Sequence, residues 1–286
     1  MIEQGRDSKW RPGVVEILAV GNELLNGTVQ DGNSYWLITQ VVELGGMVRR
    51  VGILPDDRDL VARVVAAVVR LETGRPPDAL FITGGLGPTE DDLTLSAVAA
   101  GLGLELRRHE QAREMIRRSY DDLASRGVLA QGGMNPPREK MALLPIGAVP
   151  LVNPAGTAPG VLLKYGTTTI ICFPGVPTEL KSIFETSVSP LLGDIFPAMA
   201  SARRSLWIAC NDESILAPHL RRFQEMYPAI HVKARSGVIA ENPRLEFVFS
   251  VNGSDMQAAD QVLDKGLATL TAWLEQDVIN VTHPAK

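Results

Sequence analysis

Cysteine and histidine are scarce in this sequence, and their arrangement excludes two kinds of site. The 286 residues contain two cysteines, Cys172 and Cys210, which lie far apart in apolar stretches. Disulfide frameworks belong to oxidising compartments, so we expect two reduced, buried thiols in a cytoplasmic protein. The four histidines are scattered without the spacing of metal ligands, so we do not expect a zinc site.

Long apolar runs and an excess of positive charge are also absent. No apolar stretch approaches the roughly 20 residues that span a bilayer, and residues 1–13 read as a solvated tail without a signal-peptide core. The 28 Lys and Arg against 33 Asp and Glu give a net charge of −5. We therefore expect neither nucleic acid nor a membrane as a partner. A phosphorylated small molecule, held by local amides and cations, is still a candidate ligand.

Several familiar catalytic and nucleotide-binding signatures are missing as well. The sequence has no G-x-G-x-x-G and no G-x-x-x-x-G-K-[ST], so neither a dinucleotide fingerprint nor a P-loop is supported. It has no G-x-S-x-G elbow and no S-x-x-K pair, so serine acyl chemistry lacks a nucleophile.

What is present is an alternation of predicted strands and helices. Apolar runs predict strands at 14–20, 48–54, 79–82, 161–163 and 168–173, and helical spacing predicts helices at 33–44, 57–71, 110–124 and 176–186. This order indicates an α/β domain whose mostly parallel sheet is covered on both faces.

A second, smaller domain is predicted after a change in composition. Pro190, Gly193 and Pro197 break the pattern at 189–201, where we place a boundary between a domain at 14–190 and one at 200–283. The second domain reads as strand (205–209), helix (213–226), two strands (231–234 and 244–251) and helix (255–274). Its order resembles a KH module without the G-x-x-G loop, and with the negative net charge it favours a packing or dimer module, so we expect a homodimer.

The stretch TGGLGPTEDDLT at 83–94 is the most informative motif. Gly84, Gly85 and Gly87 stand between a strand and a helix whose expected N-cap is Thr89, where free amides and the helix dipole attract anions. The adjacent Asp91 and Asp92 would repel a phosphate unless a divalent ion lay between them. We therefore predict that the amides cradle a phosphate and the acids hold Mg²⁺ or a similar ion. The alternative is a tight turn whose acids only complement the helix dipole.

Three further polar turns lie at the ends of predicted strands. GNELLNG (21–27) carries Glu23, NPAGTAPG (153–160) carries Asn153, and PGVPTEL (174–180) carries Glu179. Taken singly, each turn is more often structural, and Asn33 suits an N-cap equally well. Together they place polar groups at the strand ends of one sheet, where α/β proteins bind ligands.

With these four motifs, in this order, the sequence resembles the competence/damage-inducible protein A (CinA) family over about residues 14–190. The resemblance implies a three-layer α/β sandwich, related to the molybdopterin-binding domains of molybdenum-cofactor biosynthesis proteins, followed by a KH-like domain. It also implies metal-dependent hydrolysis of the pyrophosphate of ADP-ribose or a related nucleotide. Longer members add a C-terminal amidase domain, for which these 286 residues leave no room, so we do not expect that activity.

The resulting functional hypothesis is a metal-dependent nucleotide pyrophosphatase. Asp91 and Asp92, with Glu23, would be the catalytic acids and metal ligands. The ligand-binding residues would be Gly84, Gly85, Gly87, Thr89, Thr94, Asn33, Asn153, Gly156, Thr157, Gly175 and Glu179. The alternative is a non-catalytic protein that binds a pterin phosphate or a nucleotide, which Glu90 favours because it adds negative charge beside the phosphate site.

Overall fold

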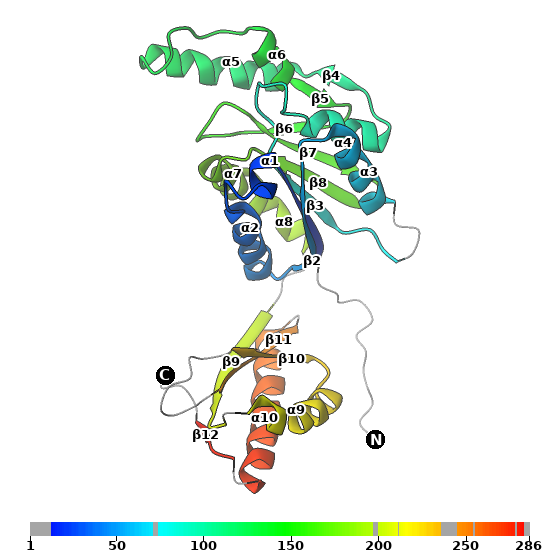
Figure 1. Ribbon diagram of the computed structural model, residues 1–286, viewed down its shortest axis with the longest axis vertical. Helices are drawn as coiled ribbons and strands as arrows, with labels where there is room; N and C mark the ends of the chain where they lie inside the picture. Colours follow the sequence, from blue (N-terminus) through cyan, green and yellow to red (C-terminus); the bar gives the residue numbers. More distant parts are fainter. Residues whose placement is uncertain are drawn as a thin grey trace. The chain divides into compact units, whose positions relative to one another are not determined.

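The computed structural model describes residues 13–70, 74–196, 200–210, 212–235, 245–253, 255–277 and 279–282. These residues form two compact units, of which the larger ends at Phe196 (Figure 1). Apart from Gly13, the predicted tail at residues 1–13 lies outside the described residues.

The larger unit is built on a six-stranded sheet in the order β2-β1-β3-β8-β7-β6. Its strands are β1 (Val14–Val20), β2 (Met47–Leu54), β3 (Ala79–Thr83), β6 (Val149–Leu151), β7 (Gly160–Tyr165) and β8 (Thr168–Phe173). The first four strands of that order pair in parallel, and β7 runs antiparallel to both of its neighbours. The predicted mostly parallel sheet is therefore confirmed.

Helices cover both faces of this sheet. They are α1 (Asn22–Leu25), α2 (Gly32–Glu43), α3 (Arg58–Val69), α4 (Thr94–Leu102), α5 (Glu110–Ser125), α6 (Pro136–Met141), α7 (Pro177–Ile183), a π-helical turn η1 (Phe184–Val188) and α8 (Ser189–Ile195). Helices α3 and α4 lie on one face, and α2, α7 and α8 lie on the other (Figure 1). A two-stranded sheet of β4 (Leu106–Arg108) and β5 (Leu143–Pro145) accompanies α5 and α6.

The two faces of the sheet bury separate hydrophobic cores, because successive side chains of a strand point to opposite faces. Leu80 and Ile82 of β3 pack into the core that contains α3 and α4. Ala79 and Phe81 of the same strand pack into the core of α2, α7 and α8. The result is the three-layer sandwich that the sequence predicts.

The larger unit ends within the predicted break at 189–201, but at a later residue than the predicted domain limit of 190. Pro190 does not interrupt the structure, because it lies in the first turn of α8. There the backbone N–H that proline lacks would have no partner within the helix. Leu192 and Phe196 then pack into the core of α2 and α7. The unit therefore extends to Phe196, past residue 190.

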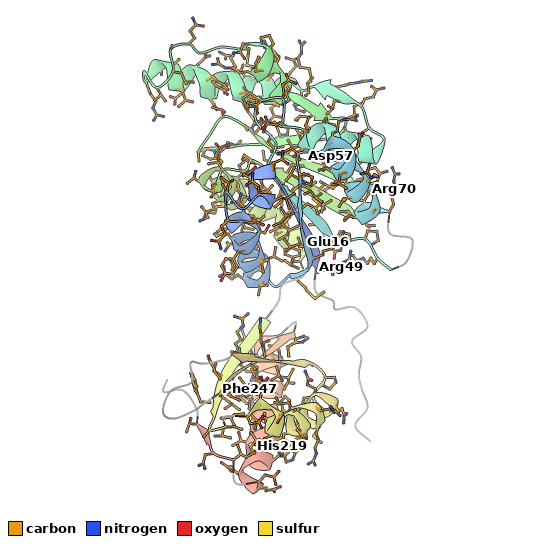
Figure 2. All side chains as sticks on the ribbon, in the orientation of Figure 1. Glu16, Arg49, Asp57, Arg70, His219 and Phe247 are labelled. Atoms are coloured by element: carbon orange, nitrogen blue, oxygen red, sulfur yellow. The ribbon has the colours of Figure 1, made fainter. Side chains whose placement is uncertain are left out.

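The smaller unit has a four-stranded antiparallel sheet in the order β10-β11-β9-β12. Its elements are β9 (Ala200–Ile208), α9 (Glu213–Met226), β10 (Ile230–Arg235), β11 (Leu245–Gly253), α10 (Met256–Gln276) and β12 (Val281–Thr282). Phe223, Phe247 and Leu270 belong to its core; Phe247 is labelled in Figure 2. A separate small α+β domain is thus present, and its kinship to KH modules stays a prediction.

An ion-pair network centred on the buried Glu16 lies near the amino ends of the parallel strands (Figure 2). Glu16 is 3% exposed, and its carboxylate contacts Arg49 Nη2 and Arg50 Nη2 at 2.6 Å each. A buried carboxylate needs a charged partner, and the two arginines, whose side chains are 35% and 53% exposed, supply it, so this network fastens β1 to the edge strand β2. Among the described residues, no helix is long and apolar enough to cross a membrane.

Candidate functional site

A cleft of about 440 Å³ lies at the carboxyl ends of β1, β3 and β8. All four predicted polar turns contribute to its wall. Glu23 comes from the first turn, Asp92 from the second, Thr157 from the third and Glu179 from the fourth. The carboxyl ends of parallel strands meet at one edge of a sheet, which is why turns so distant in the sequence share one cleft.

The glycine turn after β3 has three amides without a protein partner. Gly84 (φ 102°) and Gly85 (φ 66°) are both left-handed, and a side chain on Gly84 would place its Cβ 2.1 Å from the carbonyl oxygen of Val20. Gly84 N donates to Phe173 O at 3.0 Å, so that amide is engaged. The amides of Gly85, Leu86 and Gly87 donate no hydrogen bond within the described part of the chain, and all three residues line the cleft.

The helix after this turn begins later than the sequence suggests. We expected Thr89 as its N-cap, but α4 starts at Thr94. Asp91 and Asp92 therefore precede the helix instead of lying in its first turn. Thr94 itself, expected to bind ligand, is 1% exposed and donates from Oγ1 to Gly84 O at 2.7 Å, so it supports the glycine turn from behind.

Thr89 organises the two acidic side chains. Its amide and its hydroxyl donate to Asp92 Oδ2 at 2.8 and 2.7 Å, and the hydroxyl also contacts Asp91 Oδ1. The hydrogen bond from Thr89, a backbone hydrogen bond and the charge of Lys140 together lower the pKa of Asp91, so this carboxyl is ionised at neutral pH. Thr89 is thus a supporting residue, and it is not part of the cleft wall.

One oxygen of each carboxylate is left for a ligand. Within the described residues, Oδ2 of Asp91 and Oδ1 of Asp92 accept no hydrogen bond. Glu23 lines the same cleft, but no group of three or more His, Cys, Asp or Glu side chains in the described ranges is arranged to hold a metal ion. A cation would therefore meet the Asp91–Asp92 pair and need further oxygen ligands from a substrate.

Glu179, in the first turn of α7, is fixed by the 153–160 loop. Asn153 Nδ2 donates to Glu179 Oε2 at 2.6 Å and to Ala158 O at 2.7 Å. Gly156 packs on the same carboxylate, and a Cβ there would come within 2.1 Å of Glu179 Cδ. Burial raises the pKa of Glu179, and the hydrogen bond from Asn153 offsets part of that rise. Asn153 and Gly156 hold this acid in place, while Thr157 lines the cleft directly.

Asn33 ties two of the turns together. Its Nδ2 donates to Gly175 O at 2.8 Å and to Thr83 Oγ1 at 3.1 Å. The N-cap alternative for Asn33 is wrong, because Asp31 caps α2 by accepting from Ser34 N. Asn33 and Gly175 also line a smaller cavity of about 90 Å³ that shares Glu23 and Gly84 with the main cleft.

The sequence of the chain matches a known protein family and several similar proteins. Residues 16–194 match a protein family described as "Probable molybdopterin binding domain". The chain belongs to this family. Proteins of similar sequence include one of Pyrobaculum arsenaticum, 37% identical over 248 residues that cover 86% of this chain and 89% of the relative. Protein TK1472 of Thermococcus kodakarensis is 39% identical over 212 residues, covering 74% and 81%.

A solved structure resembles this molybdopterin-binding-domain protein over its larger unit. The crystal structure of the protein CinA from Thermoplasma acidophilum, described as having unknown function, aligns with a TM-score of 0.55 at 31% identity. The match covers 65% of this chain and 99% of that one. This likeness agrees with the CinA resemblance of the four turns.

The cleft of this family member contains one acid that sequence reasoning missed. Asp56 lies just beyond β2 and lines the cleft, and its Oδ2 accepts from Asn22 N at 2.9 Å. The sequence feature that could have revealed Asp56 is its position just after a predicted strand, in the run Pro55-Asp56-Asp57. Among the described residues, the lining carries the carboxylates Glu23, Asp56, Asp91, Asp92 and Glu179 and no Lys or Arg.

Proposed function

We propose that this protein is a divalent-metal-dependent pyrophosphatase that acts on ADP-ribose or a related nucleotide diphosphate. The observation that carries the proposal is the combination of three free amides at 85–87 with two ionisable acids, Asp91 and Asp92, in one cleft. The amides suit phosphate oxygens, but the five carboxylates repel them. A diphosphate and a divalent cation that enter together satisfy both groups.

The donor set fits a hard cation such as Mg²⁺. Asp91 and Asp92 supply carboxylate oxygens, the ligands that Mg²⁺ prefers, and the substrate's phosphates would supply others. When bound, the ion would neutralise phosphate charge and lower the pKa of a coordinated water. Glu23 lines the same cleft but forms no three-acid metal group with Asp91 and Asp92 in the described ranges, so we propose that it joins them only when the ion is bound.

The chain's own groups would then act on the diphosphate. The amides of Gly85 to Gly87 hold the non-bridging oxygens and stabilise the charge that develops on them. Glu179, half-buried with a raised pKa, accepts the proton of the attacking water. The water oxygen bonds to one phosphorus, the bond from that phosphorus to the bridging oxygen breaks, and ADP-ribose yields AMP and ribose 5-phosphate.

The second candidate is a non-catalytic protein that binds molybdopterin or a nucleotide. Two observations favour it: the family description names molybdopterin binding, and the exposed Glu90 adds a charge next to Asp91 and Asp92. Incubation of the pure protein with ADP-ribose and Mg²⁺, Mn²⁺ or Co²⁺, followed by chromatography for AMP, separates the two functions. AMP that forms only with metal supports the hydrolase, and calorimetric binding without AMP supports the alternative.

We also propose a cytoplasmic homodimer in which the smaller unit is the dimer module. Cys172 and Cys210 are free thiols, which agrees with a reducing compartment. Burial raises the pKa of Cys172 to about 12, so that thiol stays protonated and inert. Analytical ultracentrifugation of the full chain tests the dimer.

A further inference from the structure

The described residues of the cleft wall include no Lys or Arg, yet one lysine reaches a loop of the cleft from outside the wall. Lys140, in α6, donates from Nζ to the carbonyl oxygen of Thr89. Met141, the next residue, lines the cleft, and so do Pro88 and Asp91 on either side of Thr89. Lys140 is half-buried between these groups. No other Lys or Arg in the described ranges hydrogen-bonds to any of the four polar turns.

We propose that Lys140 is a ligand-binding residue that exchanges the Thr89 carbonyl for a phosphate oxygen of the molecule in the cleft. The proposal deepens the proposed function, on which it rests, because it assumes a ligand that carries phosphate. It adds a cation to a site that sequence reasoning built from acids, glycines and neutral polar groups alone.

The backbone of Lys140 is held in a fixed position by contacts of α6. Asn135 caps α6 by accepting from Arg138 N at 3.0 Å, and Glu139 pairs with Arg113 at 2.8 Å. The ammonium group stands at the end of a flexible four-carbon chain, so it can change partner while α6 stays in place. The Lys140 ammonium group contacts Thr89, the same residue whose hydroxyl contacts Asp91 and Asp92.

Electrostatic attraction favours the exchange of the Thr89 carbonyl for a phosphate oxygen. The Thr89 carbonyl is a neutral acceptor, whereas a phosphate oxygen is anionic and makes a charge-assisted hydrogen bond of roughly twice the strength. Lysine binds phosphate as a point charge that does not demand a fixed geometry. Together with the amides of Gly85 to Gly87, it would hold the phosphate from a second direction.

A purely structural role makes a different prediction. If Lys140 only fastens the glycine turn to α6, any side chain that donates to Thr89 O serves equally well. Lys140→Gln separates the two roles, because its amide can still donate to a carbonyl but carries no charge. Lys140→Arg keeps the charge. Lys164→Gln removes the charge of an exposed side chain of β7 that does not line the cleft, and is the matched control.

The test is calorimetric titration of the full chain with inorganic pyrophosphate and Mg²⁺, with thermal melts as the measure of folding. We expect Lys140→Gln to weaken pyrophosphate binding roughly 10–100-fold at an unchanged melting temperature. Lys140→Arg should retain most of the affinity and Lys164→Gln all of it. Wild-type affinity in Lys140→Gln, or equal weakening in Lys164→Gln, would overturn the proposal.

The same experiment distinguishes this proposal from the proposed hydrolysis. If the wild type binds pyrophosphate but releases no AMP from ADP-ribose, hydrolysis fails, and the Lys140→Gln titration still decides the role of Lys140. If the wild type hydrolyses ADP-ribose and Lys140→Gln binds and reacts normally, only the role of Lys140 fails. If the wild type binds no pyrophosphate with Mg²⁺, the role of Lys140 falls, and AMP release from ADP-ribose alone decides the hydrolysis.

Discussion

Asn153 and Glu179 are joined by a hydrogen bond of 2.6 Å from Nδ2 to Oε2, between a loop and a helix that lie 26 residues apart. Together with Gly156, this bond holds one carboxylate in a half-buried position at the wall of the cleft. The arrangement keeps an acid where solvation is poor, and the cost of that burial shows in its raised pKa.

Glu179→Gln should therefore stabilise the fold at neutral pH. The folded-state pKa of Glu179 lies above its ordinary value of 4.5. Its contribution to stability is therefore complete below pH 4.5 and is lost as pH rises through the raised pKa. We expect the variant to melt about 1–3 °C above the wild type at pH 7. The difference in melting temperature should vanish towards pH 4. The variant should also hydrolyse ADP-ribose more slowly than the wild type.

Melting curves across this pH range, with the exposed Glu185→Gln as control, check this prediction. A Glu179→Gln variant that melts below the wild type at pH 7 would show that burial does not strain the carboxylate.

Gly84→Ala should damage the fold itself. The residue has φ 102°, and an added Cβ would lie 2.1 Å from the backbone oxygen of Val20, which cannot move aside without disturbing β1. We expect a loss of about 2 kcal/mol or more in the free energy of unfolding. Gly32→Ala is the matched control, since Gly32 starts α2 with open space around it. Urea unfolding of both variants is the measurement; equal stability would contradict the geometry of the glycine turn.

A chain that ends at Phe196 should fold better than one that ends at Ser189. The shorter chain lacks Leu192 and Phe196, which are 0% and 2% exposed in the core of α2 and α7. Loss of a large core side chain costs about 2–5 kcal/mol, so the shorter chain should be unfolded or aggregated. Circular dichroism melts of the two chains compare them, and equal cooperative melts would place the boundary earlier, near residue 190.

Much of the fold was predictable from local patterns. The runs at 14–20 and 168–173 coincide with β1 and β8, because each is an apolar stretch between turn residues. A helix after the glycine turn was expected, but the start of α4 at Thr94 could not be predicted, since TLSAVAAGL is apolar or small on all sides and shows no helical periodicity. The acids after Thr89 resemble a helix start, but the hydrogen bonds from Thr89 to Asp92 close a separate turn.

The candidate site was also predictable only in part. That the four turns share a cleft follows from strand order, since the carboxyl ends of parallel strands lie at one edge. Lys140 could not be predicted, because the short helix PPREKM has no periodic pattern and reaches Thr89 only through the tertiary fold. Likewise, the engaged Gly84 amide depends on Phe173, far away in the sequence.

Asp92→Asn should cost some stability in the absence of metal. Asp92 Oδ2 accepts from both the amide and the hydroxyl of Thr89, and an asparagine oxygen is a weaker, uncharged acceptor. The expected loss is about 0.5–1.5 kcal/mol. The wild type should gain stability on addition of Mg²⁺, and the variant should not. Melts with and without Mg²⁺ test this, with Glu90→Gln, the exposed neighbour that makes no such bond, as control.

The most direct test of metal-dependent hydrolysis in this cleft is the rate of AMP release from ADP-ribose in the presence of Mg²⁺. We expect the wild type and Glu90→Gln to produce AMP and chelation of the metal to stop them. Asp92→Asn should be slower by at least the roughly 10–100-fold that loss of a metal-site partner costs. AMP release at the wild-type rate by Asp92→Asn, or by the wild type in excess chelator, would contradict the account.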